Sequence, residues 1–204
     1  DLVQKKSITP NDAGCLQYIE DFLSQRGFIN ETLTFGRVKN LWSVKRNNGP
    51  LLVFLGHVDV VPTGPENEWE HDPFSGYDDG TFINGRGTGD MKGGIACFMS
   101  ALSRIDVDSL NYSIGFLITA DEEGPSKDGT VKVVEELLQR NEKIDYCLIG
   151  EPSTLETVGD NIRIGRRGSI NIELEVLGKQ GHAAYPARVD NPIHKVVPFL
   201  DKLL

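Results

Sequence analysis

The chain has 204 residues, of which 39% are hydrophobic, so it can bury a substantial core and does not have the composition of a disordered chain. Its formal net charge is -9 and it has no basic run, which argues against nucleic acid and anionic membrane surfaces as partners. No apolar stretch is long enough to cross a bilayer and no signal peptide is visible, so we expect a cytoplasmic protein.

The cysteine pattern also favours a cytoplasmic protein. Cys15, Cys97 and Cys147 are scattered through apolar periodic segments and show no CxxC spacing. An odd number with these separations argues against a disulfide framework and against a cysteine-zinc site. We therefore predict reduced cysteines in the core.

The first part of the chain predicts one helix followed by strands. Thr9-Pro10 has the character of a helix start, and Gly27 ends the helical stripe. Weak alternation or an apolar run then predicts strands over 32–36, 40–46 and 51–56. Residues 62–80 predict a long surface loop, and that length indicates a function or packing over a site.

Strands and helices alternate in the middle of the chain. Helical periodicity covers 91–105 and 130–141, and apolar runs predict strands over 113–120 and 145–149. This order predicts an α/β fold with a mostly parallel sheet flanked by helices. In the second of these helices, the residues expected to face inward are Val131, Val134, Leu137 and Leu138.

The pattern changes after residue 160. Segment 161–177 predicts a strand with one solvated face, because polar residues alternate with Ile170, Ile172, Leu174 and Val176. Asn191-Pro192 predicts the start of a last helix that runs to the end of the chain. We expect a domain boundary near Gly168.

Side chains suited to metal binding follow several of the predicted strands. They are His57 and Asp59 after 51–56, Asp90 in the glycine-rich turn 85–94, Glu122 and Glu123 after 113–120, and Glu151 after 145–149. Sites in open α/β sheets collect beyond the carboxyl ends of the strands. We therefore expect one imidazole and several carboxylates at one rim, a set that suits two divalent metal ions and a general base.

Each motif taken alone has a second interpretation. His57-Val58-Asp59 is either a ligand oriented by a carboxylate or a capped turn with a surface histidine. Glu122-Glu123 is either a base beside a ligand or a solvated acidic turn. The turn 85–94 either brings backbone close around Asp90 or is merely flexible, and its glycine spacing gives only weak support for a nucleotide-binding domain.

Two further segments carry polar groups. Arg166 and Arg167 suit bidentate recognition of a substrate carboxylate, but solvated surface arginines are an equal alternative. His182 lies between small residues in a loop bounded by Gly and Pro, where it is either a donor to an oxyanion or an ordinary loop histidine. His71 and His194 are interpreted as structural.

Together these segments resemble the di-zinc aminoacylase and carboxypeptidase superfamily of metallopeptidases, across nearly the whole chain. The motifs of the superfamily are Gly56-His57-Val58-Asp59, Asp90-Met91-Lys92-Gly93, Asp121-Glu122-Glu123-Gly124-Pro125, Gly150-Glu151-Pro152-Ser153 and Gln180-Gly181-His182. Within the superfamily, the chain is most similar to the desuccinylase branch. Gly165-Arg166-Arg167-Gly168-Ser169 and the segment 122–130 favour that branch over acetylornithine deacetylases.

The resemblance implies a set of metal ligands. His57 and Glu151 would bind one Zn²⁺. Glu123 would bind the other, and Asp90 would bridge the two. Co²⁺ is a possible substitute, since carboxylate-rich sites also accept it.

The resemblance also implies catalytic roles. Glu122 would take a proton from water and pass it to the leaving amine, while Asp59 would orient the histidine ligand. His182 would steady the oxyanion in the partner subunit's site of a homodimer. Arg166 or Arg167 would hold a carboxylate of a small N-succinyl amino-acid substrate.

The implied reaction is hydrolysis of N-succinyl-L,L-diaminopimelate to succinate and L,L-diaminopimelate, in lysine and cell-wall synthesis. The implied domains are a catalytic domain over 1–168 and the start of an inserted α+β dimerisation or lid domain over 169–204. The second zinc of the family takes a histidine from a C-terminal segment that is not present before Leu204. We therefore expect either a longer enzyme or an inactive metal-binding or dimerising fragment. Acetylornithine deacetylase and carboxypeptidase activities are the alternatives within the superfamily.

Overall fold

The computed structural model describes residues 1–165, 168, 172–182 and 184–203. The chain divides into two compact units, residues 1–161 and 162–204. Arg166 and Arg167 lie outside the described residues, as do parts of the strand predicted over 161–177.

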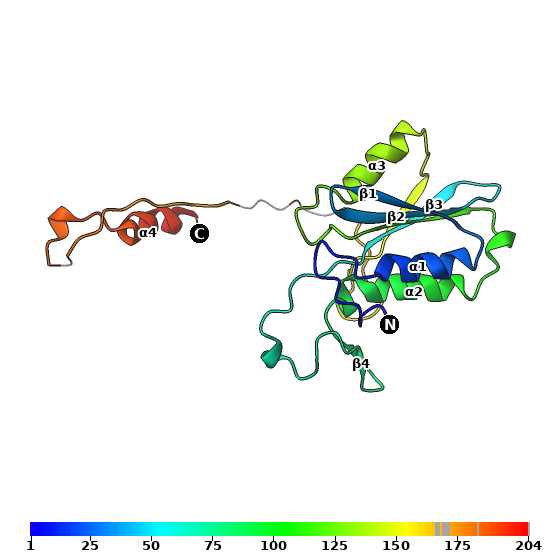
Figure 1. Ribbon diagram of the computed structural model, residues 1–204, viewed down its shortest axis with the longest axis horizontal. Helices are drawn as coiled ribbons and strands as arrows, with labels where there is room; N and C mark the ends of the chain where they lie inside the picture. The colour runs from blue at the N-terminus through cyan, green and yellow to red at the C-terminus, as the bar shows by residue number, and fades with distance from the viewer. Residues whose placement is uncertain (166–167, 169–171, 183, 204) are drawn as a thin grey trace. The chain divides into compact units, whose positions relative to one another are not determined.

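A five-stranded mixed sheet with the order β1-β2-β6-β3-β7 is the centre of the first unit (Figure 1). The strands are β1 (Ile29–Phe35), β2 (Val38–Lys45), β3 (Leu51–His57), β6 (Ser113–Thr119) and β7 (Tyr146–Ile149). β3 pairs in parallel with β6 and β7, whereas β2 pairs antiparallel with β1 and β6. The predicted α/β class is confirmed, and the parallel strands are the ones that carry the predicted ligands.

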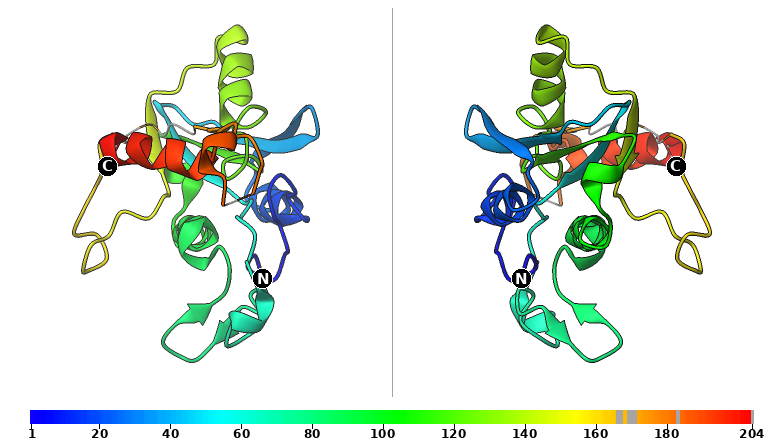
Figure 2. Two further views of the ribbon diagram at one scale, coloured as in Figure 1. Left: turned by 90° about the vertical axis from the view of Figure 1, so that its left-hand side faces the viewer. Right: turned by 90° about the vertical axis from the view of Figure 1, so that its right-hand side faces the viewer.

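Helices cover both faces of the sheet, with α1 (Cys15–Ser24) and α2 (Gly93–Leu102) on one face and α3 (Thr130–Gln139) on the other (Figures 1 and 2). All seven residues of β6 are buried. Phe116 belongs to the core under α1 and α2, and Leu117 belongs to the core under α3. Successive residues of a strand point to opposite faces, so a continuous apolar run is required in a strand covered on both sides.

The helix α1 begins at Cys15, so the predicted start at Thr9-Pro10 is wrong. The backbone N–H of Thr9 donates to the carbonyl oxygen of Val60 at 3.0 Å, and Ile8 forms a bridge with Val60. The segment is therefore used as an extended partner of the chain beyond β3. Gly14, with a φ of +81°, lies immediately before the helix.

In α3 only Val133 and Leu137 are buried. Val131 is 56% exposed, Val134 36% and Leu138 67%, so the predicted inward stripe is correct only at Leu137. The buried pair is spaced by one helical turn and packs in the core that contains β6. A short helix with several apolar residues can bury more than one of its sides, and contact with the sheet selects the side that is buried.

Cys15 is buried, and that burial raises the pKa of its thiol. Cys97 and Cys147 are exposed, so the predicted core position is wrong for these two. Cys147 lies on β7, an edge strand whose four residues are all exposed. All three thiols are free.

The segment predicted as a long surface loop leaves the sheet and is largely exposed. It contains the 3-10 turn η1 (Glu66–Glu68), and the small hairpin of β4 (Tyr77–Asp78) and β5 (Ile83–Asn84) follows. Phe74 is buried within this largely exposed segment. A second 3-10 turn, η3 (Val107–Ser109), leads from α2 into β6.

The second unit contains a 3-10 turn, η4 (Pro186–Arg188), and the helix α4 (Pro192–Leu203). The predicted last helix is therefore confirmed. Residues 172–177 do not form a strand, and Ile172 is 79% exposed, because no described segment pairs with them. Within the described part of the chain, no helix is both long and apolar enough to cross a membrane.

Candidate metal centre

The predicted ligands converge at the carboxyl ends of three adjacent parallel strands. His57 is the last residue of β3, Glu122 and Glu123 follow β6, and Glu151 follows β7. Asp90 comes from a separate turn, η2 (Thr88–Lys92), that precedes α2. Because β3 lies between β6 and β7, its histidine is at the middle of the group.

His57 is only 1% exposed, and its Nδ1 lies 2.9 Å from the carbonyl oxygen of Asp59. A carbonyl oxygen can only accept, so Nδ1–H donates and the Nε2 lone pair is free for a cation. Nε2 faces carboxylate oxygens of three residues: Asp90 at 3.0 Å, Glu151 at 3.3 Å and Glu122 at 3.8 Å. The hydrogen bond to the Asp59 carbonyl oxygen thus fixes the tautomer that metal binding requires.

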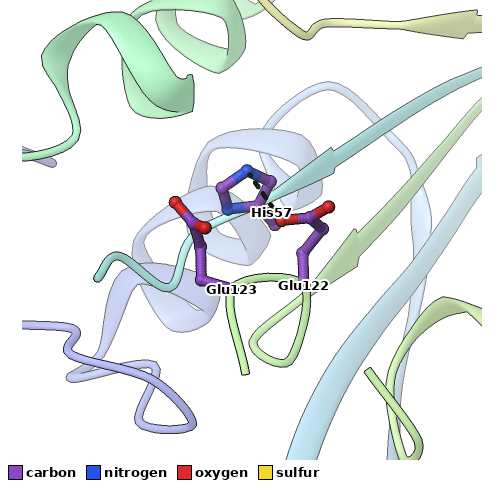
Figure 3. A group of neighbouring side chains, drawn as sticks. All are labelled: His57, Glu122 and Glu123. Atoms are coloured by element: carbon purple, nitrogen blue, oxygen red, sulfur yellow. Dashed lines mark ion pairs between the residues drawn. The ribbon is translucent and has the colours of Figure 1, made fainter. Parts of the chain in front are cut away.

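Two overlapping groups of residues offer ligand atoms that lie within 4.8 Å of one another. One group is His57, Glu122 and Glu123, in which the histidine comes from the end of β3 and both glutamates come from the loop after β6 (Figure 3). The other is His57, Asp90 and Glu151. An imidazole with several carboxylates is a donor set used by Zn²⁺ and other borderline divalent ions, so these residues fit a metal.

Burial and the neighbouring carboxylates raise the pKa of Glu123, and the carboxylates raise that of His57. Burial lowers the pKa of His57, but the Asp59 carbonyl and the charges of Asp59, Glu151 and Glu122 together raise it above its ordinary value of 6.5. Burial and the neighbouring Asp90 raise the pKa of Glu123. Crowded like charges disfavour ionisation, and a bound cation would reverse that effect.

Asp59 is fully buried and has two separate contacts. Its carbonyl oxygen holds His57, while its carboxylate accepts the backbone N–H of Glu122 at 3.2 Å and of Glu123 at 3.1 Å. Its Oδ1 is 3.6 Å from Nδ1 of His57, beyond hydrogen-bond distance. The predicted contact with the histidine is therefore made through the main chain, and the carboxylate positions the loop after β6.

Two buried residues beside Asp90 were given no role from the sequence. Met91 is fully buried, and its sulfur accepts the backbone N–H of His57 at 3.3 Å. Lys92 is 1% exposed and donates to the carbonyl oxygen of Lys5 at 2.8 Å, and burial lowers its pKa. They tie η2 to β3 and to the N-terminal segment. The only signal in the sequence is that both residues directly follow a predicted ligand.

The remaining predicted site residues lie outside the first unit, and two of them, Arg166 and Arg167, lie outside the described residues. His182 belongs to the second unit, where it is exposed and its Nδ1 accepts the backbone N–H of Ala184 at 3.1 Å. Its predicted role stays a prediction, as do the roles of Arg166 and Arg167.

The candidate centre is an open rim. Asp90 is 52% exposed and Glu122 is 51% exposed at the side chain. Cavities of about 350 Å³ and about 290 Å³ lie elsewhere, near the end of α2, and none of the predicted site residues lines them. The donors suited to a metal gather at the rim, so the rim is the candidate site.

A mixed sheet flanked by helices, with a histidine and three glutamates at the strand ends and Asp90 in a nearby turn, is the arrangement expected of a metal-dependent hydrolase. Residues 53–202 match Peptidase family M20/M25/M40, and the chain belongs to that family. Membership of a metallopeptidase family implies a metal, in agreement with the donor groups around His57.

Curated relatives match the chain along its full length. It is 53% identical over 205 residues to the succinyl-diaminopimelate desuccinylase of Marinobacter nauticus, covering 100% of this chain and 54% of the relative. It is 52% identical over 206 residues to the protein of the same name from Hydrogenovibrio crunogenus, again covering 100% and 54%. The chain therefore spans about half the length of the curated relatives it matches.

Solved structures share the fold. An M20 family metallo-carboxypeptidase from Sulfolobus solfataricus has a TM-score of 0.64 at 22% identity, over 74% of this chain and 36% of that one. A tripeptidase from Staphylococcus aureus has a TM-score of 0.60 at 19% identity, over 98% and 53%. At these identities the similarity concerns the fold alone.

Proposed function

We propose that the protein is a metal-dependent amide hydrolase that releases succinate from N-succinyl-L,L-diaminopimelate in the cytoplasm, as a step of diaminopimelate and lysine synthesis. The observation that carries this proposal is the arrangement around Nε2 of His57, whose lone pair faces Asp90, Glu122 and Glu151 within 3.8 Å. The choice of substrate is supported by the names of relatives that are 52–53% identical over the whole chain.

The proposal includes two Zn²⁺ ions. His57 and Glu151 would hold one ion, Glu123 the other, and Asp90 would lie between them; the group His57, Asp90 and Glu151 supports the first assignment. When bound, zinc would polarise the amide carbonyl and lower the pKa of a water molecule.

Glu122 is the proposed general base and acid. Its backbone is fixed through Asp59, while its carboxylate is half-exposed at the rim, where substrate and water can reach it. In that place it can take a proton from the attacking water and return it to the leaving amine nitrogen. The buried Asp59 is unsuited to that task, because backbone N–H groups already bind its carboxylate.

The second unit is proposed to begin a dimerisation domain over 169–204, in a homodimer in which His182 stabilises the oxyanion at the partner subunit's site. Arg166 or Arg167 would bind a substrate carboxylate. Support comes from α4, an amphipathic helix on which Ile193, Val197 and Leu200 are 64%, 55% and 41% exposed. Their spacing places them on one apolar side, which is typical of a helix that packs against another element.

The test is turnover by the complete gene product supplied with Zn²⁺. We expect release of succinate from N-succinyl-L,L-diaminopimelate to be at least about tenfold faster, in kcat/KM, than release of acetate from N-acetylornithine, which corresponds to about 1.4 kcal/mol of discrimination. Removal of metal with a chelator should abolish turnover, and Zn²⁺ should restore it. Analytical ultracentrifugation would determine whether the protein is dimeric.

Faster cleavage of acetylornithine would contradict the proposed substrate. Turnover of the succinyl substrate that survives complete metal removal would contradict the metal-dependent mechanism. A purified metal-loaded protein that cleaves neither compound would support the alternative of an inactive metal-binding chain.

A further inference from the structure

Asp121 lies directly before Glu122 but in a very different environment. Asp121 is only 3% exposed. Its carboxylate accepts three backbone N–H groups: Ser126 to Oδ1 at 3.2 Å, and Lys127 and Asp128 to Oδ2, both at 3.0 Å. A buried carboxylate costs free energy unless it is hydrogen-bonded, and these donors provide the bonds. Asp121 is therefore bound by the loop and belongs to neither of the two donor groups that contain His57.

The loop after β6 closes tightly around this carboxylate. A side chain on Gly124 would place its Cβ 2.9 Å from Oδ1 of Asp121, and one on Gly129 would place it 2.7 Å from the Asp121 carbonyl oxygen. Ser126 has a φ of +54°, an uncommon conformation for a residue other than glycine. These features give the loop one path, with Asp121 at its centre.

Two hydrogen bonds connect Asp121 to the backbone of Glu122. Ser126, held by Asp121 through its N–H, donates its hydroxyl to the carbonyl oxygen of Glu122 at 2.6 Å. On the other side, Asp59 accepts the N–H of the same Glu122. The backbone of Glu122 is thus fixed at both its N–H and its carbonyl by buried carboxylates, one directly and one through a serine.

We propose that Asp121 is a positioning residue that sets the orientation of Glu122 and Glu123 toward the metal ions. The inference rests on the proposed function for the role of Glu122, but its effect on metal binding by Glu123 does not depend on the substrate. Without the Asp121 carboxylate, three part-buried backbone N–H groups would lose their acceptor, and the loop would lose the hydrogen bonds that hold its conformation.

The test compares Asp121→Asn with Asp79→Asn in the complete gene product. Asp79 is a matched control, because its Oδ1 accepts the backbone N–H groups of Thr81 and Phe82 at 2.8 Å in an exposed turn between β4 and β5. Zn²⁺ affinity is measured by calorimetry, the Co²⁺ derivative is compared by its visible absorption spectrum, and kcat and KM are measured at saturating metal.

We expect Asp121→Asn to lower Zn²⁺ affinity about 10- to 100-fold, to change the Co²⁺ spectrum and to lower kcat more than it changes KM, because substitutions of residues that orient metal ligands have effects of this size. Asp79→Asn should change none of these. If Asp121→Asn folds with wild-type metal affinity, spectrum and kcat, the inference is wrong, even if the variant melts at a lower temperature. A wild-type protein without turnover would count against the proposed function alone.

Ser126→Ala tests the same inference if Asp121→Asn does not fold. It removes the hydroxyl that holds the Glu122 carbonyl and leaves the three N–H bonds to Asp121 in place. We expect a smaller decrease in kcat, with the fold retained. Unchanged kcat and metal affinity in this variant would overturn the proposed connection between Asp121 and Glu122.

Discussion

The candidate site has a buried layer and an open layer, and the same residue types behave differently in them. His57, Asp59 and Asp121 are at most 3% exposed, whereas the side chains of Asp90 and Glu122 are about half exposed. The buried carboxylates accept backbone N–H groups, while the open ones gather around Nε2 of the histidine.

The difference shows that burial and the available donors decide what an acidic residue does here. Asp121 and Glu122 are neighbours in the chain, but one is enclosed by the loop and the other reaches the rim. A carboxylate with its lone pairs occupied by N–H groups is a structural element. One without such donors remains available for a cation or a proton. Substitutions in the two layers should therefore have different consequences.

The largest effect is expected for Glu122→Gln in the open layer. Loss of the proposed base should lower kcat about 10²- to 10⁴-fold with metal content unchanged, since general acid–base catalysis contributes about that much. Steady-state kinetics and elemental analysis would check both. Glu135→Gln on α3 is the control, because Glu135 lies at the surface and accepts a hydrogen bond from Lys132. A variant that lost its metal as well would place Glu122 among the ligands.

Glu123→Gln should act on metal binding. We expect Zn²⁺ affinity to fall by more than about 100-fold, because changes to outer-shell partners alone cost about 10- to 100-fold. Calorimetric titration with Zn²⁺ would measure it, and excess Zn²⁺ should recover part of the activity. Wild-type affinity in this variant would exclude Glu123 as a ligand.

Asp59→Asn should act on the buried layer and affect both properties moderately. The amide would present an N–H group toward the donors of Glu122 or Glu123, leaving a buried polar group unsatisfied at a cost of about 1–3 kcal/mol. Chemical denaturation should therefore show lower stability, together with an approximately tenfold loss of Zn²⁺ affinity. His57 should keep its tautomer, since the Asp59 carbonyl remains. A large loss of stability without any change in Zn²⁺ affinity would show that the buried layer does not influence metal binding.

The smallest effect is expected from pH. The pKa of His57 is raised above 6.5, and only the neutral imidazole binds metal, so Zn²⁺ affinity should fall as the pH is lowered, starting above 6.5. The loss should be about tenfold per pH unit for one competing proton. The metal-free protein should behave oppositely: stability from this raised pKa is fully present below 6.5 and is lost as the pH rises through the folded-state pKa. Metal affinity that is constant from pH 8 to pH 6 would contradict this assignment.

The sequence by itself determined the strand order along the chain and the ligand types at the strand ends. His57, Glu122 and Glu151 each follow an apolar run, and parallel strands bring such ends to one edge of a sheet. This inference needs only local patterns and the rule for parallel pairing. The sequence could not establish where α1 begins or which face of α3 is buried, because contacts with Val60 and with the sheet decide those points.

Only the tertiary structure decided which atoms meet. The sequence suggested a carboxylate of Asp59 against His57, but the carbonyl occupies that place and the carboxylate reaches across to the loop after β6. Likewise, nothing in the order Asp121-Glu122 distinguishes the enclosed residue from the open one. Hydrogen bonds between segments more than 60 residues apart, and the choice between solvent and N–H donors, are set by packing and leave no local pattern in the chain.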